Sequence, residues 1–143
     1  MALKTPRVHH KTKKVAKKAV KKSKKSTNRK PKIVIRSQVW AGCRMDTCFY
    51  DQRPALFETN ACDVRLDSAG NIVVTYDDPD GQVFYSGRDL GSGHFRLTFP
   101  KRQAEATLHR FSHSKILEGY WREAGDEGMW RIRLGRVPRT VVE

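Results

Sequence analysis

The sequence predicts an all-β fold: a small antiparallel up-and-down β-barrel of about eight strands, preceded by a disordered basic N-terminal tail. From Ile33 onward, apolar and polar residues alternate in short segments, and a period of two is typical of strands. Turns rich in Gly, Asp and Pro separate these segments. Before Ile33 the chain is dominated by lysine and lacks the apolar residues that a folded core requires.

The charge of the chain is distributed very unevenly. The 143 residues carry a formal net charge of +14. Residues 1–32 contain 14 Lys and Arg and no Asp or Glu, whereas the remaining residues hold 15 basic and 15 acidic side chains. The entire excess of positive charge therefore lies in the first 32 residues. We divide the chain into a disordered Lys-rich tail, residues 1–32, and an antiparallel β-barrel domain, residues 33–143.

The alternating segments predict the strands in chain order. The predicted strands are 33–40, 56–67, 71–78, 82–89, 93–100, 106–112, 115–122 and 129–134. Residues 40–56 are expected to form a bend or long loop, and 137–143 a short trailing segment. So many short antiparallel strands must protect their edges, which favours closure into a barrel over a two-sheet sandwich.

The clearest pair of strands is Lys115–Leu134, in which two alternating runs flank a Gly- and acid-rich turn. Leu117, Gly119 and Trp121 share one face of the first run. Trp130 lies on the corresponding apolar face of the second run. Two tryptophans on facing strands predict a large buried anchor for the core.

The spacing of glycine and aromatic residues resembles a known group of barrels. Four segments resemble the Trp/Gly corners of calycin-type barrels: Trp40-Ala41-Gly42, Tyr85-Ser86-Gly87, Gly119-Tyr120-Trp121 and Gly128-Met129-Trp130. That group includes lipocalins and avidins, and the pattern is also similar to barrel domains that sense cyclic oligonucleotides in bacterial antiphage effectors. The resemblance implies a barrel whose lumen holds a small ligand, for example a nucleotide.

The tail carries the strongest functional signal. Its composition resembles the Lys/Ala/Val tails of linker histones and of histone-H1-like bacterial proteins. Lysines are compact point charges that bind phosphates without discriminating between bases. The predicted nucleic-acid-binding residues are Lys11, Lys13, Lys14, Lys17, Lys18, Lys21, Lys22, Lys24, Lys25, Arg29, Lys30 and Lys32. A solubilising tail or a nuclear targeting signal is the alternative. An anionic membrane surface is a third possibility, but the tail lacks the aromatic or leucine face that would insert.

A second possible anion site lies within the domain. Its candidate residues are Arg96, Arg122, Arg131 and Arg133, on the polar faces of neighbouring predicted strands. Arginine forks grip phosphates in a bidentate manner, so these residues could bind a ligand or an anion. The alternative is a solvated outer face whose charge is balanced by nearby carboxylates, and the zero net charge of the domain favours that alternative.

Neither a metal site nor a cofactor is predicted. His109 and His113 are four residues apart and His94 lies on a neighbouring predicted strand, but ordinary surface or hydrogen-bonded histidines explain this spacing better than metal ligands. Cys43 and the other two cysteines lack CxxC spacing and are expected to be small buried thiols. No nucleophile with a base, paired-carboxylate site or phosphate loop is recognisable, so we do not expect an enzyme.

The expected location is intracellular. Three cysteines do not make a disulfide framework, no hydrophobic signal segment begins the sequence, and no apolar run approaches the ~18 residues of a membrane helix. The expected compartment is the nucleoid or cytoplasm in a bacterium, or the nucleus in a eukaryote.

Three functions follow from these features. The first is a non-enzymatic protein whose tail tethers the barrel to DNA or RNA without sequence specificity. The second is a small-ligand sensor or carrier whose tail serves localisation. The third is an assembly protein of a phage or ribonucleoprotein particle.

Overall fold

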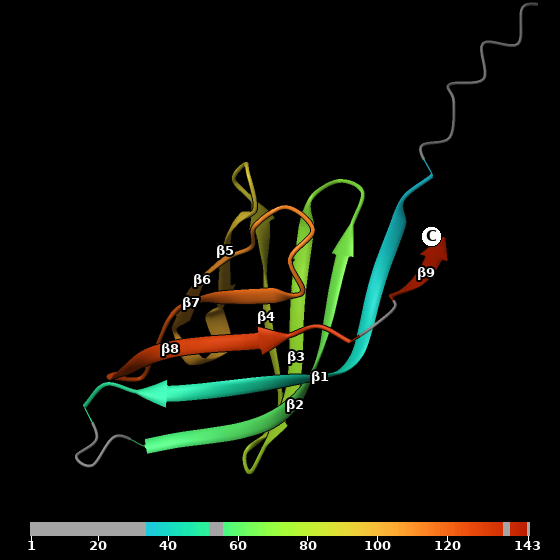
Figure 1. The fold of residues 1–143 in the computed structure, drawn as a ribbon. Coiled ribbons are helices and arrows are strands. Elements are labelled where there is room, and N and C mark those ends of the chain that lie inside the picture. The colour runs from blue at the N-terminus through green and yellow to red at the C-terminus, as the bar shows by residue number, and fades with distance from the viewer. Residues whose placement is uncertain (1–33, 52–55, 136–137, 143) are drawn as a thin grey trace, which may run out of the picture. The chain divides into compact units, whose positions relative to one another are not determined.

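The computed structural model describes residues 34–51, 56–135 and 138–142, and over these residues the chain is all-β (Figure 1). A 3₁₀ turn, η1 (Pro100–Arg102), is the only helical element assigned in them. The strands are β1 (Arg36–Phe49), β2 (Leu56–Asp67), β3 (Asn71–Asp78), β4 (Gly81–Asp89), β5 (His94–Phe99), β6 (Ala104–His109), β7 (Ile116–Glu123), β8 (Asp126–Arg133) and β9 (Arg139–Val142).

The sheet closes on itself. Each strand from β2 to β7 pairs antiparallel with the next one in the chain, β8 pairs with β1, and β1 pairs back onto β2. The short β9 adds to the beginning of β1. The predicted fold, a closed antiparallel barrel of eight strands, is therefore confirmed. The predicted tail, residues 1–32, lies outside the described residues.

The expectation of a loop over residues 40–56 is wrong for most of that range. β1 continues through it to Phe49 as a single strand of 14 residues. Its register against β2 shifts between Trp40 and Cys43, where Gly42 takes a positive φ of 61°. This bulge bends the strand, so its first part pairs with β9 and its second part with β8. The trailing segment also differs from expectation, because residues 139–142 form β9.

The lumen is filled mainly by side chains. The inward positions of β3, β5, β6 and the first part of β7 supply aliphatic and aromatic residues that are almost fully buried, such as Ile72, Leu97 and Leu117. Trp121 and Trp130 also point inward, and their rings stack with centroids 6.1 Å apart. The predicted tryptophan anchor of the core is therefore confirmed.

Three of the glycines in the aromatic pattern sit where neighbouring strands come very close. A Cβ added to Gly87, Gly119 or Gly128 would lie 1.7–1.8 Å from a carbonyl oxygen of the adjacent strand. At these positions the barrel wall curves so tightly that only glycine fits. The Gly/aromatic spacing in the sequence thus marks places of high curvature.

We expect Gly119→Ala to destabilise the barrel by about 3 kcal/mol, the upper end of overpacking costs, because its Cβ would meet the backbone oxygen of Thr107 at 1.7 Å. Gly135→Ala is the matched control, because the atom nearest to its added Cβ is 3.9 Å away. Urea unfolding of both variants measures the difference. Equal stability of the two variants would show that the wall can relax around the methyl group.

The two ends of the barrel are built from different connections, and we name them the near mouth and the far mouth. The near mouth is where β1 begins, together with the β2–β3, β4–β5 and β6–β7 connections (Figure 1). The far mouth is where β1 ends, together with the β3–β4 turn, η1 and the β7–β8 turn. Each end therefore presents its own set of side chains to solvent.

Candidate functional site

The far mouth holds a cavity of about 220 Å³. Its inner wall is aromatic, with Trp121 and Trp130 buried and Phe49 and Tyr76 half-buried. The rings of Phe49 and Tyr76 each meet a tryptophan edge-on, with centroids 5.1 and 6.1 Å apart. The cavity is smaller than the ~300–1,000 Å³ of drug-sized pockets, so it suits a small ligand.

A hydrogen-bond network crosses this mouth. The Arg102 guanidinium donates to both carboxylate oxygens of Asp78, and from Nη1 to Glu123 Oε1 at 3.2 Å. The buried Tyr85 hydroxyl donates to Glu123 Oε2 at 2.8 Å. Hydrogen bonding to Arg102 holds the Asp78 pKa below its usual range, and the same pairing raises the pKa of Arg102. The single guanidinium is therefore committed to two carboxylates.

The local field at the cavity is negative. Burial raises the pKa of Tyr76, and the nearby charges of Glu123 and Asp78 raise it further. Glu58 and Asp126 add two more carboxylates to the lining. An additional negative charge at this mouth is disfavoured.

One buried polar group of the lining has no hydrogen-bond partner among the described residues. The Trp121 indole N–H is buried without a hydrogen-bond acceptor, and it lies close to Gly128. Buried polar groups are normally satisfied, so this donor is an exception in the cavity wall.

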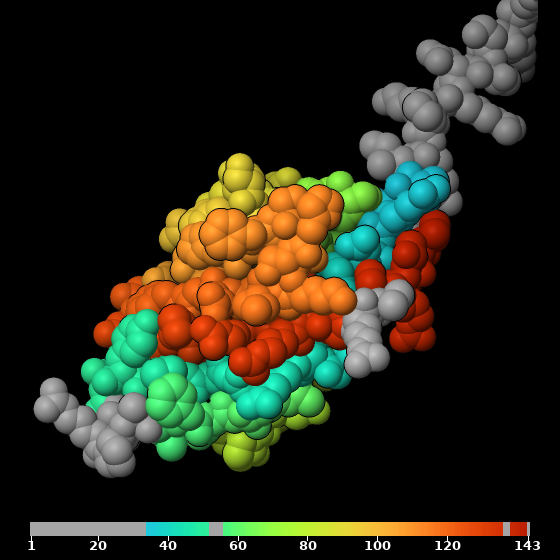
Figure 2. Space-filling view, viewed as in Figure 1, coloured from blue at the N-terminus to red at the C-terminus, as the bar shows by residue number. Residues whose placement is uncertain are grey.

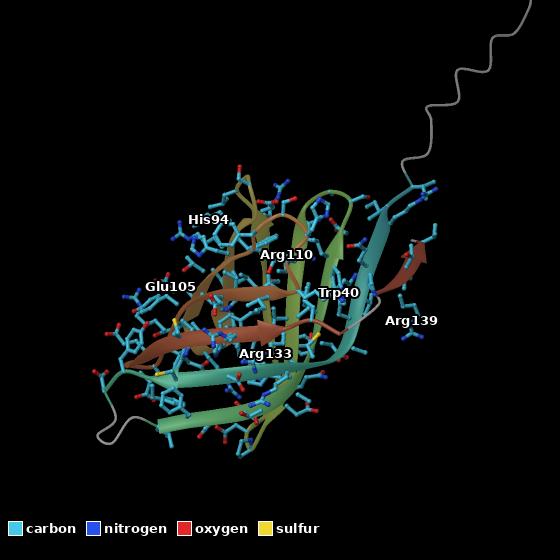
Figure 3. All side chains as sticks on the ribbon, in the orientation of Figure 1. Trp40, His94, Glu105, Arg110, Arg133 and Arg139 are labelled. Atoms are coloured by element: carbon cyan, nitrogen blue, oxygen red, sulfur yellow. The ribbon has the colours of Figure 1, made fainter. Side chains whose placement is uncertain are left out.

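At the near mouth a cation lies over an aromatic ring. The Arg110 guanidinium carbon lies 5.3 Å from the Trp40 ring centroid, and its Nε donates to the Ser114 carbonyl at 2.7 Å (Figure 3). Burial lowers the Arg110 pKa. A wide, open groove beside it is lined by Lys115 and Asp89. The lining of this groove has Arg110 and Lys115 with one carboxylate, Asp89, whereas the far-mouth lining has four carboxylates and one guanidinium.

The predicted arginine site is spread over the outer wall. Arg122 pairs with Glu105 at 2.8 Å, Arg131 with Glu118, and Arg133 with Asp46 at 2.6 Å. In each pair the carboxylate is on a neighbouring strand. Arg96, on β5, is exposed on the same outer side of the sheet. Figure 2 shows β7, β8 and β1 forming one continuous surface on the face in view.

The histidines meet in a different pair from the one that the spacing suggested. His94 and His109 are register partners on β5 and β6, with Nδ1 of the first 2.5 Å from Nε2 of the second. His113 instead lies in the β6–β7 connection with a φ of 63°. In the part of the chain that the structure describes, no three His, Cys, Asp or Glu side chains gather as a metal site.

Two of the cysteines also face each other. Cys43 and Cys62 are register partners on β1 and β2, and both are buried and free. A hydrogen bond from Cys62 lowers the pKa of Cys43 to about 7, while the same bond and burial raise the pKa of Cys62. Cys48 is half-buried and free. The expectation of buried thiols is therefore confirmed for two of the three.

Sequence reasoning missed the far-mouth network. Arg102 lies in a short polar connection that carried no strand signal, and its partners come from turns far apart in the chain. The sequence offered only two indications of this network: Asp78 lies in a predicted turn, and Glu123 lies at the end of an alternating run. Only the closure of the barrel brings these positions together.

Among the described residues, no helix is long and apolar enough to cross a membrane. The nucleic-acid-binding residues predicted in the tail lie outside those residues. Comparison of the chain with protein-family models, with curated proteins and with solved structures found no match.

Proposed function

We propose that the chain is a non-enzymatic, nucleic-acid-associated protein in which residues 1–32 bind DNA or RNA phosphates without sequence specificity and tether the barrel. The observation that carries this proposal is the segregation of charge. All of the excess positive charge is in that segment, which holds 14 basic residues and no acidic one. Such a segment can neutralise several phosphates at once and release their counterions.

The barrel wall supports the same assignment. Three outward arginines are already paired with carboxylates on adjacent strands, so their charge is largely cancelled locally. The strand that follows the basic segment in the chain, β1, begins at the near mouth, where Arg110 and Lys115 are found. These cations would favour an approach of the near mouth to a polyanion, with the acidic far mouth turned away.

The proposal predicts indifference to sequence. Two DNA duplexes of equal length and unrelated sequence should bind the full chain with affinities within about threefold, because the proposed contacts join lysine ammonium groups to phosphates and not to base edges. Fluorescence anisotropy at fixed salt measures both affinities. Arg96→Gln with Arg122→Gln, on the outer wall, is the control and should leave them unchanged. A preference above about 30-fold for one duplex, or a loss of binding in the control, would contradict the proposal.

A second function is favoured by the far-mouth cavity: the binding of a small ligand, with the basic segment as a localisation device. The closed eight-stranded barrel is consistent with a calycin-like protein, in which the barrel holds the ligand. Here most of the lumen is packed, and the space that is left lies at one mouth. The two functions are compatible, because they use separate parts of the chain.

A further inference from the structure

The far-mouth cavity combines aromatic walls with a rim of carboxylates. Phe49, Tyr76, Trp121 and Trp130 line it, and the first two are only partly buried, so part of each ring remains accessible. Aromatic faces carry negative electrostatic potential and attract cations that lie over them. Such walls also supply apolar contact for alkyl groups. This combination suits a cation that carries hydrocarbon.

The charge of the cavity lining also favours a positively charged ligand. Four carboxylates (Glu58, Asp78, Glu123 and Asp126) stand against one guanidinium (Arg102), so the lining has a formal charge of −3. Arg102 already donates to two of these carboxylates, which leaves no uncommitted cation to hold a phosphate. The nucleotide suggested by the barrel resemblance would therefore meet repulsion here. A positively charged ligand would meet attraction from Glu58 and Asp126 at the rim.

A buried polar group points to a ligand independently of the carboxylates. Trp121 lines the cavity and is 5% exposed. Its indole N–H is buried without a hydrogen-bond acceptor among the described residues. A buried donor without an acceptor is costly, and a ligand that carries a hydroxyl oxygen supplies the acceptor that this N–H lacks.

We propose that the far mouth binds a small organic cation, an alkylated or protonated amine, with its charge between the aromatic wall and the carboxylate rim. The proposal rests on the small-ligand function given above and names the ligand class for that site. The cavity volume of about 220 Å³ limits the ligand to a small molecule, and the depth of the aromatic wall favours one that carries alkyl groups on its nitrogen.

The test compares two compounds of the same shape with the full-length chain. Choline carries a quaternary ammonium, and 3,3-dimethyl-1-butanol replaces its charged nitrogen with carbon. Calorimetric titration, supported by tryptophan fluorescence, gives both affinities. We expect choline to bind about tenfold or more tightly than the alcohol, the factor that a partly desolvated cation–π contact supports. The basic segment repels only choline, so it works against the expected result.

Matched variants place the binding at the far mouth. Glu58→Gln with Asp126→Asn removes the two rim carboxylates that lie outside the Arg102 network, and it should weaken choline binding about three- to tenfold. Glu105→Gln with Glu118→Gln makes the same change of charge on the outer wall and should leave choline binding unchanged.

Three outcomes would overturn the assignment. Equal affinity for choline and the alcohol would contradict the proposed preference for a cation, but the small-ligand function of the cavity would stand. Equal weakening by the rim and outer-wall variants would mean diffuse attraction in place of a site. Absence of saturable binding by either compound would reject the cation site together with the small-ligand function. None of these results bears on nucleic-acid binding, which is measured separately.

Discussion

Deletion of residues 1–32 is expected to lower the affinity for duplex DNA by at least about 100-fold at low salt, because phosphate neutralisation supplies nearly all of non-specific binding. The remaining 15 basic and 15 acidic residues leave no net charge to replace it. The barrel itself should stay folded, because the buried hydrophobic side chains among the described residues lie between Trp40 and Leu134. Fluorescence anisotropy and circular dichroism measure the two properties on one protein.

The control for this deletion is a chain in which residues 1–32 are shuffled in order but keep their composition. Since the proposed contacts depend on charge and not on order, the shuffled chain should bind within about threefold of the original. Loss of binding on shuffling would point to a defined motif, such as a targeting signal. Loss of the cooperative unfolding transition on deletion would mean that the segment is part of the fold.

Trp130→Ala is expected to lower the free energy of unfolding by about 3–5 kcal/mol, the usual cost of removing a large buried aromatic ring. The ring is 2% exposed and contacts Tyr85 at 4.9 Å and Trp121 at 6.1 Å between centroids. Truncation would leave a void in the middle of this cluster that the curved wall cannot close. Urea unfolding monitored by circular dichroism measures the loss.

Met129→Ala provides the comparison for this variant. Met129 is the neighbouring residue on the same strand, but it faces outward and is 38% exposed. Its truncation should change the free energy of unfolding by no more than about 0.5 kcal/mol. If Trp130→Ala were as mild, the role of Trp130 as a core anchor would be contradicted.

Local alternation was sufficient to predict much of the barrel. The run that contains Leu117 and Trp121 and the run that contains Trp130 form β7 and β8 with the predicted inward faces. The turn between them is tighter than the sequence suggested, because Ala124 and Gly125 alone connect the strands, both with positive φ. A period of two is a local property, so it is visible in the sequence.

Features that depend on closure were not predictable in the same way. The part of β1 after Gly42 was expected to be a loop because a bulge interrupts its alternation. The far-mouth cavity was not predicted from the sequence for a related reason. Arg102 contacts Asp78 and Glu123 only because closure of the barrel brings three separate connections to the far mouth. The pairing of the outer-wall arginines likewise depends on register between strands, which no single segment contains.

The most direct test of the central claim, that the basic segment is a non-specific nucleic-acid tether, is a salt titration of duplex binding by the full chain and by residues 33–143. A plot of log affinity against log salt for the full chain should have a slope of about −5 to −9, which corresponds to about 5–10 neutralised phosphates. The truncated chain should show no measurable binding over the same range. A full-chain slope near zero, or equal affinity and slope for the two chains, would contradict the claim.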